Sequence, residues 1–180
     1  RAGGSGLGGH LLTENELAGQ AQNGIWLGGS SLTSGDKVLN NTISGAGISG
    51  VSISFGTSET ISGNDISGCS QGVEVDWADN QVSDNVLSNN TRGVMIGNDA
   101  DRNLVSRNSI ADGAFGVLIS PSQGNQVVGN AITRMTRTDS AVGIYLGIGE
   151  VVDTLIEGNE MTGCNVGLRA ATVSGQEITG

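Results

Sequence analysis

The chain has 180 residues and a formal net charge of −10, from 18 acidic and 8 basic residues. This balance offers no basic face for nucleic acid, and it would repel polyanions unless a divalent cation or a local basic patch intervened. Hydrophobic residues make up 36% of the sequence, with 31 glycines and one proline, which argues against a collagen-like or proline-rich disordered chain. No run of about 18 apolar residues is present, so we expect no membrane partner.

Residues 1–10 are rich in glycine, and we interpret them as a flexible or linker-like segment. The repeats that follow predict a single domain over residues 11–180. The last repeat is shorter than the others and ends without a polar cap, although the terminal repeats of a solenoid need covering. We therefore expect this domain to be a fragment of a longer solenoid.

One pattern recurs along residues 11–180: an apolar residue, two variable residues, Asn, one variable residue and a second apolar residue. In chain order its copies are Leu12–Asn15–Leu17, Val38–Asn41–Ile43, Ile61–Asn64–Ile66, Val82–Asn85–Leu87, Val105–Asn108–Ile110, Val127–Asn130–Ile132, Ile156–Asn159–Met161 and Val173–Gln176–Ile178. The asparagines are 21 to 29 residues apart. Alternation of apolar and variable residues is strand periodicity, and its recurrence at a near-fixed interval indicates one solenoid coil per repeat.

A second pattern, Gly-apolar-x-apolar, lies between these copies. Its members begin at Gly24, Gly50, Gly72, Gly93, Gly116, Gly143 and Gly167. Together the two patterns predict an all-β fold, a parallel β-helix of seven to eight coils with neighbouring strands about 4.8 Å apart. We place the recurring Asn at a corner, because Asn tolerates left-handed backbone and because stacked amides can hydrogen-bond along the axis.

These units resemble the repeats of the pectin lyase-like superfamily. The stretch Ile61–Gly68 is similar to NosD-like proteins and to mannuronan C5-epimerase modules. The resemblance covers residues 12–178 and implies a right-handed coil, three sheets and polysaccharides as the substrate class. The Asp-Pro-His-Glu signature of the epimerases is absent, since the only proline is Pro121 and the only histidine is His10. The matching positions are structural, so the resemblance indicates a fold rather than an activity.

Strand alternation predicts which side chains leave the core after each repeat glycine. The second position faces solvent and reads, in chain order, Trp26, Ser52, Glu74, Met95, Leu118, Tyr145 and Arg169. The fourth reads Gly28, Ser54, Asp76, Gly97, Ser120, Gly147 and Ala171. Glu74 and Asp76 are about 6.6 Å apart along one strand. They are the acid and base candidates of a polysaccharide lyase, glycoside hydrolase or epimerase, and a solvated surface pair is the alternative.

Met95, Leu118 and Tyr145 are neighbours in the second position, so they predict an exposed apolar patch. Such a patch suits a sugar-stacking platform or an oligomer interface. An insertion expected around residues 136–140 carries positive charge that could meet an anionic group of a ligand. The predicted substrate-binding residues are therefore Trp26, Met95, Leu118, Tyr145, Arg169 and Arg137.

Acidic turns of adjacent coils suggest a metal site formed by Asp79, Asp99 and Asp101, whose oxygen atoms suit Ca²⁺. The alternative is ordinary turn chemistry, in which Asp bonds its own backbone. We expect no required cofactor, with Ca²⁺ as an optional ligand. Cys69 and Cys164 fall on the same coil position about 19 Å apart, which is too far for a disulfide.

These observations predict a polysaccharide-recognising β-helix module of a secreted or cell-surface carbohydrate-active protein. Its partner would be a polysaccharide or another glycan, and the residues leave open whether it also catalyses a reaction. The alternative is a structural shaft, as in an adhesin or a phage tail spike. In that case the apolar patch would be buried between subunits of a homo-oligomer, or against further domains of the same protein.

Overall fold

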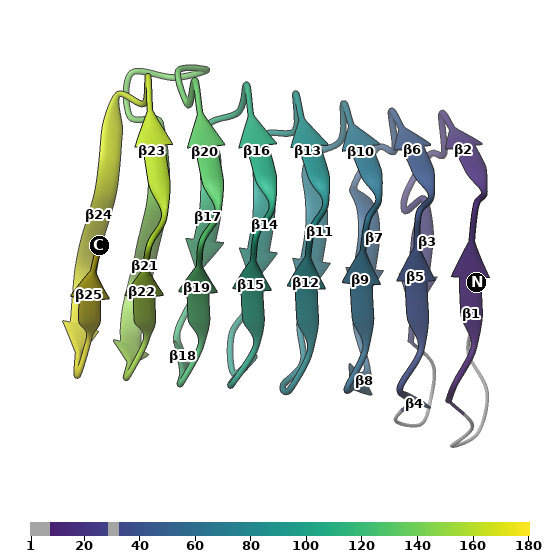
Figure 1. The fold of residues 1–180 in the computed structure, drawn as a ribbon, viewed down its shortest axis with the longest axis horizontal. Helices are drawn as coiled ribbons and strands as arrows, with labels where there is room; N and C mark the ends of the chain where they lie inside the picture. Colours follow the sequence, from purple (N-terminus) through teal and green to yellow (C-terminus); the bar gives the residue numbers. More distant parts are fainter. Residues whose placement is uncertain (1–7, 29–32) are drawn as a thin grey trace.

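The structure is a computed structural model that describes residues 8–28 and 33–180, and every regular element in these ranges is a β-strand. Consecutive strands wind around a common axis, so that each coil lies beside the next from one end of the molecule to the other (Figure 1). All strand pairings join adjacent coils in parallel. The predicted parallel β-helix is therefore confirmed, and the described part of the chain contains no helix long and apolar enough to cross a membrane.

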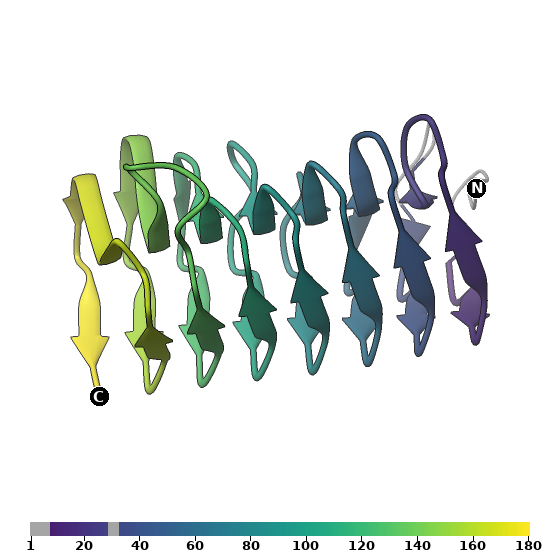
Figure 2. The ribbon, with the colours of Figure 1, turned by 90° about the horizontal axis from the view of Figure 1, so that it is seen from above.

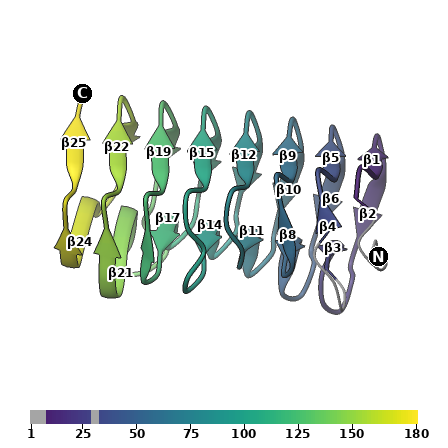
Figure 3. The same ribbon diagram turned by 90° about the horizontal axis from the view of Figure 1, so that it is seen from below.

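Three sheets run along the solenoid, as Figures 2 and 3 show from above and below. Sheet A contains β3 (Ile25–Leu27), β7 (Ser49–Ile53), β11 (Gln71–Val75), β14 (Arg92–Ile96), β17 (Phe115–Ile119), β21 (Val142–Val152) and β24 (Val166–Ser174), and β18 (Ser122–Gln123) pairs with the end of β21. Sheet B contains β1 (Leu11–Thr13), β5 (Lys37–Leu39), β9 (Thr60–Ser62), β12 (Gln81–Ser83), β15 (Leu104–Ser106), β19 (Gln126–Val128), β22 (Leu155–Glu157) and β25 (Glu177–Thr179). Sheet C contains β2 (Glu16–Ala18), β6 (Thr42–Ser44), β10 (Asp65–Ser67), β13 (Val86–Ser88), β16 (Ser109–Ala111), β20 (Ala131–Thr133) and β23 (Glu160–Thr162). A short ladder joins β4 (Thr33–Ser34) to β8 (Gly56–Thr57).

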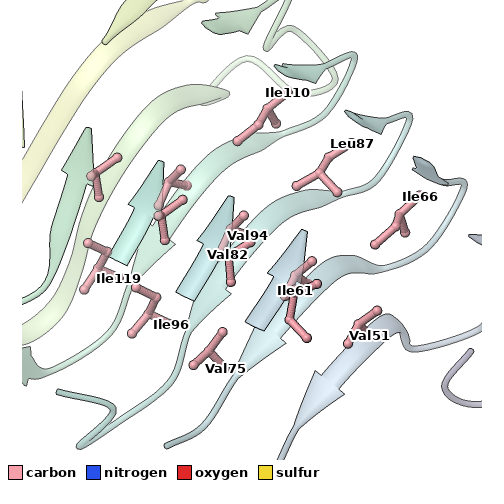
Figure 4. Close-up of a cluster of buried hydrophobic side chains, with 14 of the residues drawn as sticks. Val51, Ile61, Ile66, Val75, Val82, Leu87, Val94, Ile96, Ile110 and Ile119 are labelled. Carbon is pink, nitrogen blue, oxygen red and sulfur yellow. The ribbon is translucent and has the colours of Figure 1, made fainter. Parts of the chain in front are cut away.

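The core consists of branched aliphatic side chains from all three sheets, and their stacking is visible in Figure 4. Within one coil, Val75 points inward from sheet A, Val82 from sheet B and Leu87 from sheet C. These three side chains are 0–1% exposed. Because each repeats its neighbour's residue type, the core continues without interruption from coil to coil.

The repeat glycines let the backbones of adjacent coils approach closely where sheet A begins. A Cβ built on Gly93 would lie 2.6 Å from the carbonyl oxygen of Gly116 in the next coil. The same clash recurs at Gly24, Gly50, Gly72, Gly116 and Gly143. Only glycine fits this column, because any side chain would force the coils apart.

An asparagine ladder joins the coils at the corner between sheets B and C. The side-chain oxygen of each ladder Asn accepts hydrogen bonds of 2.9–3.0 Å from the backbone and side-chain nitrogens of the Asn in the preceding coil. The side-chain nitrogen also donates to a strand carbonyl of the preceding coil, as Asn85 does to Ile61. Each interior Asn is almost fully buried, so its polar atoms depend on these bonds. The predicted amide ladder is confirmed.

The prediction that the ladder Asn has left-handed backbone is wrong, because the left-handed residue is the one before it. The residue before each ladder Asn has the positive φ, for example Asp84 at 60° and Arg107 at 54°, whereas the ladder residues themselves do not. The exposed residue makes the turn, and the amide of the Asn that follows bonds along the corner. Asn is present here for its amide and not for its backbone preference.

A second buried ladder lies at the corner between sheets A and B and was not predicted. The backbone nitrogens of Glu59, Asn80 and Asn103 donate to the side-chain oxygens of Asn80, Asn103 and Asn125, respectively, over 2.8–2.9 Å. All four residues are at most 3% exposed. Two corners of the solenoid are therefore held by stacked side-chain amides.

Exposed ion pairs reinforce the corners between adjacent coils. In each pair one guanidinium contacts both oxygens of a carboxylate in the preceding coil; the pairs are Asp79–Arg102, Asp84–Arg107 and Asp112–Arg134. The hydrogen bonds from arginine lower the pKa of each of these carboxyl groups. Three of the eight basic residues thus bind carboxylates of the preceding coil.

We predict that Asn85→Ala lowers the free energy of unfolding by about 3 kcal/mol, because it leaves the buried polar groups of Asn64 and Ile61 without their partners. Urea unfolding followed by circular dichroism measures this change. The matched control is Asn98→Ala, since Asn98 is exposed and its side chain makes no hydrogen bond within the described residues; we expect a change within about 0.5 kcal/mol. Equal effects of the two substitutions would contradict the role given to the ladder.

The glycine column gives a second prediction. Gly93→Ala should lower the free energy of unfolding by about 1–3 kcal/mol or more, because the new methyl group overlaps the backbone of the next coil. Gly167 occupies the same strand position in the last coil, and a Cβ there meets nothing within 4 Å. Gly167→Ala should therefore leave the free energy of unfolding within about 0.5 kcal/mol of that of wild type. Thermal unfolding of both variants tests the difference.

Candidate functional site

The outward side chains of sheet A form straight columns. The strand register pairs Trp26 with Ser52, Ser52 with Glu74, and Glu74 with Met95. It continues through Leu118, Tyr145 and Arg169. The predicted order of the second-position column is therefore present in the structure. We call this surface, with the fourth-position column beside it, the outer face of sheet A; β11 and β14 lie at its middle (Figure 3).

Glu74 and Asp76 lie together at the centre of this face. The Ser49 hydroxyl donates a 2.7 Å hydrogen bond to Oε2 of Glu74 and fixes that carboxylate. Asp76 is half-buried, and its carboxylate has no hydrogen-bond or ion-pair partner among the described residues. Burial, together with the nearby charge of Glu74, raises the pKa of Asp76 from 3.8 to about 6. The two carboxyl groups therefore differ in environment, as an acid and base pair requires.

Two aromatic rings stand beside Asp76 and were not predicted as site residues. Trp77 follows Asp76 in the turn after β11, and its ring lies 5.1 Å from that of Phe55 in the preceding coil, centroid to centroid. A hollow of about 430 Å³ opens next to them, lined by Asp76, Trp77, Ala78, Asn98 and Asp99. Strand periodicity does not extend into turns, so the pattern that located Asp76 could not place Trp77.

An apolar patch follows Glu74 on the outer face. Met95, Leu118 and Tyr145 are adjacent and partly exposed, as predicted. Phe115 joins them, because its ring stacks on Tyr145 with a centroid distance of 5.7 Å. Phe115 directly precedes a repeat glycine, and the sequence interpretation assigned no outward column to that position. The contact between Ser49 and Glu74 shows that this position also faces outward.

The predicted basic residues do not meet. Arg169 lies at the C-terminal end of the second-position column, beside Tyr145. Arg137 lies in the exposed loop between β20 and β21, and its guanidinium faces the Asn89 carbonyl and the Thr91 hydroxyl at 3.4 and 3.3 Å. Arg92, which was not predicted, begins β14 on the outer face, and its buried Nε has no hydrogen-bond partner in the described ranges. Positive charge is thus placed at the start of strand β14 and in the last strand of sheet A, β24, whereas Asp76 follows the end of β11.

The proposed metal ligands lie in adjacent coils: the backbone nitrogen of Asp79 donates to the carbonyl oxygen of Asp101, and Asp99 and Asp101 line one hollow. Asp79 is held by Arg102, and Asp101 accepts a 2.7 Å hydrogen bond from the backbone of Gln123. Asp99 lines the hollow beside Trp77. Within residues 8–28 and 33–180, no group of three or more His, Cys, Asp or Glu side chains is arranged to hold a metal ion. Asp79, Asp99 and Asp101 therefore do not form such a group in the described residues. Both cysteines are free, as expected.

Residues 3–132 match the protein family described as "Right handed beta helix region". The chain belongs to the right-handed β-helix family. This match confirms the handedness that the pectin lyase-like resemblance implied. A comparison with curated proteins found no match.

Two solved structures show the same fold. The A-module of mannuronan C-5 epimerase AlgE4 from Azotobacter vinelandii aligns over 97% of this chain and 55% of that one, with 15% identity and a TM-score of 0.74. The periplasmic alginate epimerase AlgG aligns over 87% of this chain and 43% of that one, with 15% identity and a TM-score of 0.62. The chain therefore spans about half the length of these proteins. At this identity the likeness establishes the architecture, and the site has to be argued from its own side chains.

The raised pKa of Asp76 leads to a prediction. Its carboxyl should titrate near pH 6 in the folded protein, as measured by NMR of the side-chain carboxyl carbon. Glu74→Gln should lower this pKa but leave it above 3.8, because burial is the larger cause and remains.

The sign of the effect on stability follows from linkage. A folded-state pKa above the unfolded value stabilises the protein fully below pH 3.8, and this stabilisation is lost as pH rises to about 6. The free energy of unfolding of Asp76→Asn, relative to that of wild type, should therefore be higher at pH 7 than at pH 4. Urea titrations of both proteins at both pH values measure this difference. A relative loss over this interval would contradict the assignment.

Proposed function

We propose that this chain is a polysaccharide-recognising module of a carbohydrate-active protein and that the outer face of sheet A is its binding surface. The observation that carries the proposal is the pair of partly buried carboxyl groups, Glu74 and Asp76, at the centre of that face. Neither contacts a cation in the described residues, so their charges are not part of the scaffold. Carboxylates left available in this way suit ligand hydroxyls.

The shape of the face fits a chain-like ligand. Strands of adjacent coils are about 4.8 Å apart, so a polymer lying along the solenoid axis meets the same position of successive coils in turn. It would pass Trp26 at one end, Glu74 at the centre and Tyr145 at the other end. Aromatic and apolar side chains on both sides of a polar centre are typical of small-molecule and glycan sites.

If the module is an enzyme, Asp76 is the acid and Glu74 the base. A carboxyl with a pKa of about 6 still holds a proton in part of the molecules near neutral pH, as a general acid requires. The Ser49 hydroxyl donates to Glu74 and keeps that carboxylate oriented. Proton transfer of this kind serves glycoside hydrolysis, elimination and epimerisation alike.

The solved structures of similar fold support a glycan ligand, because both are named as epimerases of mannuronan or alginate. One of them is described as periplasmic, which supports our proposal that this chain acts outside the cytoplasm, at the cell surface or in the periplasm. We retain Ca²⁺ as an optional ligand.

The test is a binding and turnover screen against neutral and acidic polysaccharides, with and without Ca²⁺. Wild type is compared with the double variant Glu74→Gln/Asp76→Asn. The matched control is Glu16→Gln/Asp65→Asn, which removes the same charges from exposed positions of sheet C. We expect the site variant to lose at least about tenfold in affinity, or about 1.4 kcal/mol, while the control stays within twofold.

The remaining outcomes separate the alternatives. Product release by wild type that disappears in the site variant would identify an enzyme, and binding without product would identify a recognition module. Absence of binding to every glycan would overturn the proposal. A trimer or dimer by light scattering, broken by Leu118→Asp in the apolar patch, would then favour the structural shaft.

A further inference from the structure

We infer that the hollow lined by Asp76, Trp77, Ala78, Asn98 and Asp99 is a subsite for an uncharged pyranose ring. This inference rests on the proposed function and goes further, because it names the class of sugar bound at one position of the outer face. The hollow spans two adjacent coils: Asp76 and Trp77 follow β11, and Asn98 and Asp99 follow β14. Its volume of about 430 Å³ falls within the usual range for small-ligand sites.

The absence of a side chain at Gly97 leaves room for the Asp76 carboxylate at the hollow. Gly97 lies between β14 and Asn98, and a Cβ at this position would collide with the Oδ1 atom of Asp76. The Asp76 carboxylate therefore lies over bare backbone of the next coil. A larger residue at position 97 would displace this carboxylate from the hollow. The position of the Asp76 carboxylate therefore depends on glycine at position 97.

The wall of the hollow is a flat aromatic surface. The Trp77 ring packs against Phe55 at 5.1 Å with an interplanar angle of 36°, so the indole is supported from the preceding coil. Trp77 is partly exposed toward the hollow. The C–H face of a pyranose ring is apolar and packs against such a surface, while its hydroxyl groups point sideways to polar neighbours.

Suitable polar neighbours are present at the rim. The side chains of Asp76, Asn98 and Asp99 make no hydrogen bond to other described residues. Carboxylates accept hydrogen bonds from hydroxyl groups, and the Asn98 amide can both donate and accept. One aromatic wall with several unpaired polar groups around it matches the two-sided character of a sugar ring.

The charge at the hollow selects against acidic sugars. Asp76 and Asp99 line it, and Glu74 lies two residues from Asp76 on the same strand face. The closest arginine in sequence, Arg102, is bound in bidentate fashion to Asp79 at 2.8 Å. Arg92 lies at the far end of β14. A uronate carboxylate would meet uncompensated negative charge in a partly desolvated place, whereas a neutral ring would not.

The experiment is calorimetric titration of the whole chain with matched neutral and acidic oligosaccharides. The neutral probes are oligomers of glucose, mannose, galactose and xylose, and the acidic probes are oligogalacturonate and oligomannuronate. We expect wild type to bind at least one neutral probe and to bind the acidic probes at least tenfold more weakly. Trp77→Ala should weaken neutral binding at least tenfold, and Trp77→Phe, which keeps a flat ring, should stay within about threefold.

Asp99→Asn tests the charge separately from the shape. Asn tolerates the positive φ of 59° at this position, so the variant should fold, and its amide keeps a polar group at the rim of the hollow. Acidic probes should bind at least threefold more tightly to this variant. The control Asp65→Asn, on sheet C, removes the same charge elsewhere and should leave acidic binding unchanged.

The two proposals fail in different ways. Acidic probes that bind as tightly as neutral ones, or unchanged neutral binding in a folded Trp77→Ala variant, would overturn this inference. The proposed function would stand in that case, provided that Glu74→Gln/Asp76→Asn still reduces binding. No binding of any probe to wild type would overturn both.

Discussion

The structure depends on the hydrogen bonds between stacked asparagine amides at the corner of sheets B and C. Each interior amide is buried and satisfies backbone and side-chain groups of the neighbouring coil, so a shift of one residue between coils would leave several buried polar atoms unpaired. The ladder thereby fixes the register between coils. A fixed register places Glu74 beside Met95 on the outer face, although 21 residues separate them in sequence. The geometry of the candidate site therefore depends on the register that the asparagine ladder fixes.

The scaffold also determines where charge is left for a ligand. Corner residues with positive φ include several Asp and Arg residues, and three such pairs bind across adjacent coils. These exposed pairs contribute modestly to stability, but they neutralise arginines that would otherwise offset the acidic surface. Arg102 illustrates this, because its commitment to Asp79 leaves the neighbouring Asp99 uncompensated. The hydrogen bond from Arg102 lowers the pKa of Asp79, whereas burial raises that of Asp76, so the two carboxyl groups have different environments.

Periodicity made the coils, the core and the second-position column predictable, because these features repeat with every coil. It also contained a signal for the second ladder that the prediction overlooked: Asn80, Asn103 and Asn125 each stand two residues before an inward valine of sheet B. Phe115 and Arg92 were missed because strict alternation fails at the glycine that follows the strand start. Trp77 and the Asp79–Arg102 pair lie in turns, where contacts depend on how two coils stack and no local pattern reports them.

Inward and outward positions carry different information about function. Inward positions are mostly Val, Ile and Leu, and the glycine and amide columns allow almost no variation. Chains with 15% identity can share this fold when these positions keep their residue types. Outward positions meet no such constraint, and their side chains can change without cost to the core. The ligand preference of a β-helix is therefore decided by outward residues and by turns such as that of Trp77. The coil does not require the Asp76 carboxyl beside the Trp77 indole, so both groups are available to the ligand that we propose.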